Sequence, residues 1–305
     1  MWLLFAVFAY FLISINLTLD KIILGKSIPS PVTYCFYMGL LSIFGLVFAP
    51  FGRVWAGPEN ALFGILVGMV FLLALFVMYK VLFRGEASRV GPAIGGMTPI
   101  FVSLLAFIFL GESFGPLKIV AFLFLVSGGL LISYRGGKID FNEKKFASFY
   151  MIVLSAFLFG VYYILLKSVF NEQNFVSGFI WTRIGSFLGA LLMLAYPKNR
   201  EIIFGSTKSM KFSSGGLLLF NKTLSGVAFA FLNYAIFLGS VSIINAMQGL
   251  QYVFLFLLAT FLSQKYPKLI AEKIDKKSLL QKGMALMLIV AGLFIIAYNH
   301  SVKGF

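Results

Sequence analysis

The chain has 305 residues, of which 60% are hydrophobic and only 11% are charged, and its formal net charge is +15. Because so few polar residues cannot cover the surface of a soluble globule of this length, the composition excludes a soluble domain and indicates a protein embedded in lipid. The single cysteine, Cys35, and the single histidine, His300, exclude a cysteine cage or a histidine cluster. We therefore expect no metal site and no cofactor.

Ten long apolar runs fill most of the chain. A bilayer core of about 30 Å takes roughly 20 helical residues to cross, and the runs lie at 2–19, 31–49, 61–80, 91–110, 117–134, 146–166, 175–196, 216–238, 243–263 and 283–298. Their apolarity is continuous rather than alternating, which favours helices over the strands of a barrel. The sequence predicts an all-α, polytopic membrane protein with ten transmembrane helices. The first run has no basic flank and no cleavage site after it, so we expect it to remain as a helix.

The basic residues gather in alternate loops. The loops after the first, third, fifth, seventh and ninth runs hold most of them, whereas the other side has only Arg53, Lys118, Lys167 and Lys303. The positive-inside rule predicts that the odd-numbered loops are cytoplasmic and that both termini are outside. Because the positive charge forms no continuous face, we expect no nucleic-acid partner; the basic loop Lys265–Lys282 could instead dock on anionic lipid headgroups.

The two halves of the chain repeat each other. Residues of the third and fourth runs align without a gap with residues of the eighth and ninth, and the fifth run matches the tenth. The matched pairs include Phe83 with Phe237, Gly85 with Gly239, Ser88 with Ser242, Gly95 with Gly249, Lys118 with Lys282, Ala121 with Ala285, and Gly128 with Gly292. We assign one repeat to residues 1–135 and the other to 145–299. Each unit has five helices, an odd number, so the sequence predicts an inverted repeat, as in many secondary transporters.

A known family shows a similar pattern. The stretch Ala87–Ser133, with Pro99 before an apolar helix that ends in Leu110-Gly111-Glu112 and then a helix with Gly128-Gly129, resembles the EamA-type repeat of the drug/metabolite transporter superfamily. The resemblance covers nearly the whole chain. It implies a ten-helix permease that exports or exchanges small metabolites such as amino acids, drugs, sugar phosphates or nucleotide sugars.

The resemblance extends to helix ends but is incomplete in the second repeat. Lys21 and Lys167 look like the lysines that end the first helix of each repeat in that family. In the second copy, Val253 stands where Pro99 would be, and Lys265-Tyr266 stands where Gly111-Glu112 would be. These departures weaken the inference about the substrate more than they weaken the resemblance to the family.

Two cations lie at bilayer depth. Arg183 and Lys222 each have too few residues between them and the end of their run for a full crossing, so the helix must begin before them. Their side chains either snorkel to the headgroups or form a cationic site in a central cavity. No acidic residue lies at comparable depth in the sequence, since Asp20 and Glu112 close their helices. A cationic site without an acidic neighbour favours a carboxylate or phosphate ligand.

Polar residues share faces of two helices in the second half. Asn233 follows Lys222, Ser225 and Phe229 at helical spacing, and Asn245, Gln248 and Tyr252 follow one another at spacings of three and four. Both stripes could line a substrate site or act as hydrogen-bonding contacts between helices. We include Arg183, Lys222, Asn233, Asn245, Gln248 and Tyr252 as candidate substrate-binding residues.

Other features predict packing or gating. Lys21 and Lys167 close the first and sixth runs and either anchor them at the interface or gate the two mouths. Pro92 and Pro99 share one face of the fourth run and either shape it or hinge it. The pairs Gly64 with Gly68, Gly91 with Gly95 and Gly185 with Gly189 have GxxxG spacing, which indicates close helix packing within a monomer, with a homodimer as the alternative.

These observations favour a secondary transporter in the cell membrane. We expect a small organic solute, anionic or zwitterionic, such as an amino acid or a phosphorylated or carboxylated compound, moved by alternating access. A multidrug exporter of cationic compounds is the alternative. A membrane-embedded lipid-modifying enzyme is disfavoured because the ten acids and one histidine are scattered, so we expect no catalytic residues.

Overall fold

The computed structural model describes residues 1–24, 30–84, 87–112, 115–133, 143–208, 215–265 and 276–302, and these residues are almost entirely helical. The helices are α1 (Trp2–Leu24), α2 (Pro31–Leu41), the 3₁₀ helix η1 (Ser42–Phe51), α3 (Pro58–Arg84), α4 (Ala87–Leu110), α5 (Pro116–Ser133), α6 (Glu143–Glu172), α7 (Phe175–Met193), α8 (Pro197–Lys208), α9 (Gly215–Leu238), α10 (Val241–Ala246), α11 (Gly249–Lys265) and α12 (Lys276–Val302). The predicted all-α fold class is confirmed for the described part of the chain.

The starts of several helices follow from local sequence. Proline is the first residue of α2, α3, α5 and α8, where its fixed φ suits a helix and its missing N–H costs nothing. Asn174 and Ser240 precede α7 and α10, and their side chains accept hydrogen bonds from the backbone N–H of Ser177 (3.0 Å) and Ile243 (3.3 Å). Helices α6 and α7 are therefore separated by a capped turn rather than by a long loop.

Seven of the described segments are long and apolar enough to cross a membrane. They lie in α1, α2 with η1, α3, α4, α6, α7, and α10 with α11, and shorter apolar stretches occur in α5 and α12. This composition confirms the membrane-like helical architecture that the sequence predicted. The chain is therefore compatible with a multi-pass membrane protein.

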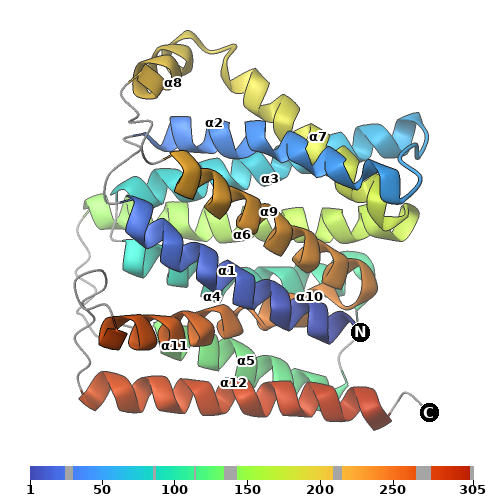
Figure 1. Ribbon diagram of the computed structural model, residues 1–305. Helices are drawn as coiled ribbons and strands as arrows, with labels where there is room; N and C mark the ends of the chain where they lie inside the picture. Colours follow the sequence, from blue (N-terminus) through green and yellow to red (C-terminus); the bar gives the residue numbers. More distant parts are fainter. Residues whose placement is uncertain are drawn as a thin grey trace.

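The helices form a stack of roughly aligned rods (Figure 1). In the view of Figure 1, α8 lies at the top, α2 and α7 below it, α3 and α6 beneath them, and α12 at the bottom beside α5. The most extensive contacts join α5 with α12, α3 with α7, α1 with α9, and α6 with both α3 and α4. The N-terminus and the end of α12 lie at the same end of the stack.

Glycine lets the backbones of α3 and α7 touch. A Cβ added at Gly68 would overlap the carbonyl oxygen of Thr182, and one at Gly185 would overlap that of Ile65. The Ser186 hydroxyl also donates to the Gly68 carbonyl at 3.0 Å. The GxxxG pairs of α3 and α7 thus pack these two helices against each other within one chain, as the sequence predicted.

The predicted ninth run is not one continuous helix. It is divided into α10 and α11, and the residues between them use bonds to the third residue back, such as Gln248 N–H to Asn245 C=O (3.0 Å) and Leu250 N–H to Met247 C=O (2.9 Å). Such a 3₁₀-like turn interrupts the α-helical ladder. Apolar length alone could not reveal it, because every residue from 241 to 250 except Gln248 is buried.

Candidate functional site

Arg183 lies in the middle of α7 and is surrounded by aromatic rings. Its guanidinium carbon is 4.7 Å from the ring centre of Phe229, 5.1 Å from that of Phe71 and 5.4 Å from that of Phe179. These rings come from α9, α3 and α7, so three helices build the cage. Only 6% of Arg183 is exposed, which shows that the side chain does not snorkel to a headgroup.

The hydrogen bonds of Arg183 are incomplete. One terminal nitrogen donates to the Tyr162 hydroxyl at 3.3 Å, whereas the buried Nε has no hydrogen-bond partner among the described residues. With three rings close to the guanidinium carbon and Nε left without a hydrogen-bond partner, the remaining donors suit a carboxylate, which accepts two parallel hydrogen bonds from arginine. Burial of a cation that has no counter-ion among the described residues is costly, which favours a functional role for Arg183.

Asn233 lies one turn after Phe229 on α9, and it has an acceptor, rather than a donor, without a hydrogen-bond partner in the described residues. Its side-chain nitrogen donates to the Phe229 carbonyl at 2.7 Å, while its Oδ1 is buried and accepts no hydrogen bond within the described residues. The region around Phe229 therefore has a free donor on α7 and a free acceptor on α9. A ligand with both an acceptor and a donor group could use them together.

Lys222 lies on the same face of α9, two turns before Phe229, or about 10 Å along the axis. Its ammonium contacts the Tyr34 hydroxyl of α2 and lies 4.7 Å from the centre of that ring. The neighbouring Asn221 accepts two hydrogen bonds from Asn16 of α1, at 2.7 and 2.9 Å. On α9, Lys222 thus contacts α2 and Phe229 contacts α7, whereas Asn221 contacts α1.

The other three candidates lie in a different place, at the break between α10 and α11. Asn245 is buried, and its side chain donates to the Val241 carbonyl of its own helix at 2.9 Å. The Tyr252 hydroxyl donates to the Gly91 carbonyl of α4 at 3.3 Å, and Gln248 lies against Gly95. Tyr252 and Gln248 thus contact α4, whereas the Asn245 side chain bonds within α10.

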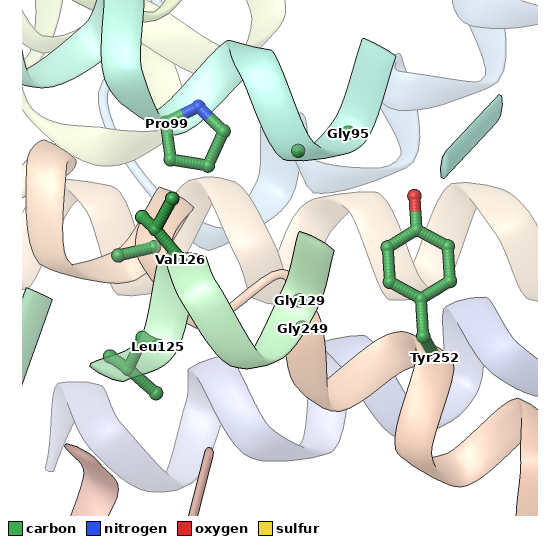
Figure 2. Close-up of a pocket in the computed structure, with 9 residues that line it drawn as sticks. Gly95, Pro99, Leu125, Val126, Gly129, Gly249 and Tyr252 are labelled. Atoms are coloured by element: carbon green, nitrogen blue, oxygen red, sulfur yellow. The ribbon is translucent and has the colours of Figure 1, made fainter. Parts of the chain in front are cut away.

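Figure 2 shows the seam between α4, α5, α10 and α11 from close by, with the Tyr252 hydroxyl directed towards the turn of α4 that carries Gly95. Pro99, Val126 and Gly249 also line it, and its volume is about 10 Å³. That space suits about one water molecule and no organic solute. Pro99 therefore lines a packed contact, and no part of this seam holds a substrate in the conformation described.

A second polar network lies near the α9–α10 turn and links the end of α4 to α10 and α6 to α9. The Glu112 carboxylate, after α4, accepts hydrogen bonds from the Ser240 hydroxyl (2.9 Å) and the Val241 N–H (3.2 Å) at the start of α10. Lys167 of α6 donates to the carbonyls of Ile236 (2.9 Å) and Phe237 (3.2 Å) in the last turn of α9. Each charge thus complements a helix end.

Replacing Glu112 tests whether this network stabilises the fold. We expect Glu112→Ala to lower the free energy of unfolding by about 2 kcal/mol, because two hydrogen bonds to a charged acceptor are lost at the start of α10. The matched control is Glu59→Ala, which removes an exposed carboxylate from the first turn of α3 and should cost less than about 0.5 kcal/mol. Thermal unfolding in detergent measures both, and equal midpoints for the two variants would contradict this role.

The remaining gating candidates are placed only in part. Lys21 lies in the last turns of α1 and Pro92 near the start of α4, but their side chains fall outside the described part of the structure. Lys167 is half-buried and donates hydrogen bonds to backbone carbonyls of α9. Its role as a gate stays a prediction.

The rings that form the Arg183 cage were missed in the sequence. The chain has 37 phenylalanines and 13 tyrosines, so residue type alone distinguishes none of them. Phe229 shares a helical face with Lys222 and Asn233, which was a usable signal. Phe71 and Tyr162 reach Arg183 only through tertiary packing, and Glu112 was interpreted only as a helix end. In the described residues, no group of three or more His, Cys, Asp or Glu could hold a metal ion.

Comparisons with known proteins concern the fold alone. No family model matches the chain. No curated protein sequence matches it either. Its fold is similar to that of a solved structure described as "Crystal structure of protein", with a TM-score of 0.67 and 17% identity over 98% of this chain and 96% of that one. The similarity over nearly the full length of both chains shows that this helical arrangement occurs in another protein.

Proposed function

We propose that this protein is a secondary transporter of a small anionic or zwitterionic organic solute, of the drug/metabolite transporter type, located in the cell membrane. Ten crossings and two inverted five-helix repeats would provide the two access states. The solute's acidic group would bind Arg183 in the plane of its guanidinium, and a donor group such as an ammonium would bind Asn233 Oδ1. Lys222 would attract the solute from the end of the stack where α9 begins.

Reciprocal helix contacts support the repeat. Gly128 of α5 lies against Ala285 and Ile289 of α12, and Gly292 of α12 lies against Ala121 and Leu125 of α5. In the sequence alignment of the two halves, Gly128 matches Gly292, Ala121 matches Ala285 and Leu125 matches Ile289. The residues that Gly128 contacts are therefore the repeat equivalents of those that Gly292 contacts, as a pseudo-twofold axis requires.

Helix pairs show the same reciprocity. If α1–α5 and α6–α12 are the two repeats, α1 corresponds to α6 and α9 corresponds to α3. The α1–α9 contact then has its equivalent in the α6–α3 contact, and both are among the most extensive in the molecule. This pairing supports a carrier built from two interlocked halves that can rock about a shared site.

The observation that carries the transport proposal is the state of Arg183. It is buried, its Nε has no hydrogen-bond partner in the described residues, and no carboxylate of those residues forms an ion pair with it. A structural arginine in an apolar bundle would be expected to have a counter-ion or a full set of carbonyl partners. A binding site for an anionic ligand would explain why the Arg183 Nε has no hydrogen-bond partner in the described residues.

Ligand-dependent thermal stabilisation of the purified protein tests the substrate class. The panel should include amino acids, organic acids, sugar phosphates and cationic drugs, and a binder at a hundred times its Kd should add about 2.7 kcal/mol to the free energy of unfolding. Compounds that stabilise should then exchange with labelled solute in proteoliposomes. Stabilisation by anionic or zwitterionic compounds supports the proposal, whereas stabilisation by cationic drugs alone would contradict it.

A further inference from the structure

The loop between η1 and α3 is tied to the α6–α7 turn. Asn174 donates to the Arg53 carbonyl (3.1 Å), and both Ser177 and Trp181 donate to the Val54 carbonyl (3.0 Å each). Gly57 then adopts a φ of 91°, which glycine allows without strain, and α3 starts at the next residue. These bonds hold the loop in one position against the two helices.

A pocket opens between this loop and the α6–α7 turn. It has a volume of about 380 Å³, and its lining includes Arg53, Trp55, Glu172, Gln173 and Asn174. We call it the vestibule. Its volume falls in the range of small-molecule sites, which begins at about 300 Å³. The backbone hydrogen bonds described above fix one wall of this pocket.

The vestibule carries one positive and one negative charge that do not pair. Arg53 comes from the loop and Glu172 from the end of α6, both are exposed, and within the described residues neither side chain takes part in an ion pair or hydrogen bond. The Gln173 amide is already used, since it donates to the Asn60 carbonyl (2.8 Å) and accepts from Ser177 (3.0 Å). The two charges thus remain available to a ligand.

Trp55 adds an apolar surface. The residue is 56% exposed, and its indole contacts that of Trp181 in an edge-on geometry, with ring centres 6.0 Å apart. A ligand that matches all three features has a carboxylate for Arg53, an ammonium for Glu172 and a small apolar body for Trp55. We propose that the vestibule is a second binding site, selective for small zwitterions.

The vestibule lies at the mouth of the proposed pathway. Asn174 caps α7, and Arg183 follows nine residues later on the same helix, about 13 Å deeper. Between them, Phe48 of η1 packs on Phe179 with ring centres 5.2 Å apart, and Phe179 forms part of the Arg183 cage. The Phe48–Phe179 pair therefore lies at a depth between the vestibule and Arg183. If the vestibule holds a solute before it moves on to Arg183, that role rests on the proposed transport function. Binding of a zwitterion in the vestibule does not depend on transport.

The test is a titration of tryptophan fluorescence in the full-length protein carrying Arg183→Met, which removes the central site. The probes are L-leucine, N-acetyl-L-leucine, which lacks the positive charge, and L-leucine methyl ester, which lacks the negative charge. We expect L-leucine to give a saturable change that disappears in Trp55→Phe. Each derivative should bind about fivefold more weakly or worse, because one exposed ionic contact is lost.

Matched variants separate the vestibule from general surface charge. Arg53→Gln and Glu172→Gln should each weaken L-leucine binding about fivefold. Glu59→Gln and Lys118→Gln neutralise a carboxylate and an ammonium that do not line the pocket, and they should leave binding unchanged. Absence of a saturable signal, or equal binding of the three probes, overturns the proposal. If Arg183→Met does not fold, the same titration of the unchanged chain with and without Trp55→Phe decides the question.

The outcomes also distinguish the two proposals. If Arg53→Gln and Glu172→Gln leave L-leucine binding intact while Arg183→Met abolishes solute exchange in proteoliposomes, the vestibule is overturned and the carrier function stands. If both vestibule variants weaken L-leucine binding but no solute of the panel exchanges across the membrane, the vestibule stands and the carrier function is overturned.

Discussion

Replacing Arg183 with methionine is expected to abolish ligand-dependent stabilisation while leaving the ligand-free protein folded. Affinity for the anionic or zwitterionic solute should fall at least about 30-fold, because a buried charged contact to a ligand contributes about 2–5 kcal/mol. Methionine is flexible and apolar, so it can fill the space between the rings of Phe71 and Phe229. The expected result is thus a loss of function without a loss of structure.

Opposing terms of similar size explain why stability should change little. Removing Arg183 loses three cation–π contacts and one hydrogen bond to Tyr162, each contributing on the order of 1 kcal/mol. It also removes the cost of burying a cation that has no counter-ion among the described residues, which is several kcal/mol. We therefore expect the free energy of unfolding without ligand to change by less than about 2 kcal/mol.

Two further variants show whether charge or shape matters. Arg183→Lys keeps the charge but cannot make two parallel hydrogen bonds, so the affinity should be intermediate. Arg200→Met removes an exposed guanidinium that donates two hydrogen bonds to the Leu194 carbonyl, so it should lower stability by about 1 kcal/mol or less and leave affinity unchanged. Melting curves with and without solute measure all of these effects. Retention of affinity within about threefold in Arg183→Met would show that the cage is purely structural.

The sequence predicted the fold class well because lipid imposes a simple rule. Apolar runs long enough to cross the bilayer identify helices regardless of their tertiary partners. The same rule does not predict where such a helix is interrupted. The break at Ala246–Gly249 depends on bonds such as Gln248 N–H to Asn245 C=O, and residue types that suit a buried helix equally suit a buried turn.

The candidate site could be predicted only in part. Arg183 and Lys222 were chosen as candidates because charge at bilayer depth is costly, a rule that needs no contacts. Asn245 and Tyr252 satisfied the spacing rule for a polar face, but spacing does not show what the face meets. In the structure they bond to Val241 and to Gly91 of α4, so the protein itself uses those groups.

Glycine spacing was more informative than polar spacing. A GxxxG pair predicts that another backbone can approach, and it makes no assumption about a partner's chemistry. Gly68 and Gly185 meet at the α3–α7 crossing, where each faces a carbonyl of the other helix. A Cβ added at Gly91, by contrast, would meet no atom within 4 Å, so the spacing rule succeeded for two pairs and only half of the third.

Replacing Gly185 with alanine is expected to destabilise the protein by about 3 kcal/mol or more. The new methyl group would overlap the Ile65 carbonyl, and because backbone atoms rather than flexible side chains oppose it, the two helices must move apart. Their separation would also break the hydrogen bond from the Ser186 hydroxyl to the Gly68 carbonyl. Since Arg183 lies on α7 and Phe71 on α3, the cage would open and solute affinity would fall together with stability.

Gly226→Ala in α9 is the matched control, because Gly226 is exposed and a Cβ there meets no atom within 4 Å. Alanine favours a helix over glycine by about 1 kcal/mol, so this variant should be as stable as the unchanged chain or slightly more stable. The two substitutions are chemically identical but should have effects of opposite sign. Thermal unfolding midpoints in detergent give the comparison. Equal midpoints for the two variants would mean that α3 and α7 can separate without cost, and the rigid frame assumed for the Arg183 cage would then be wrong.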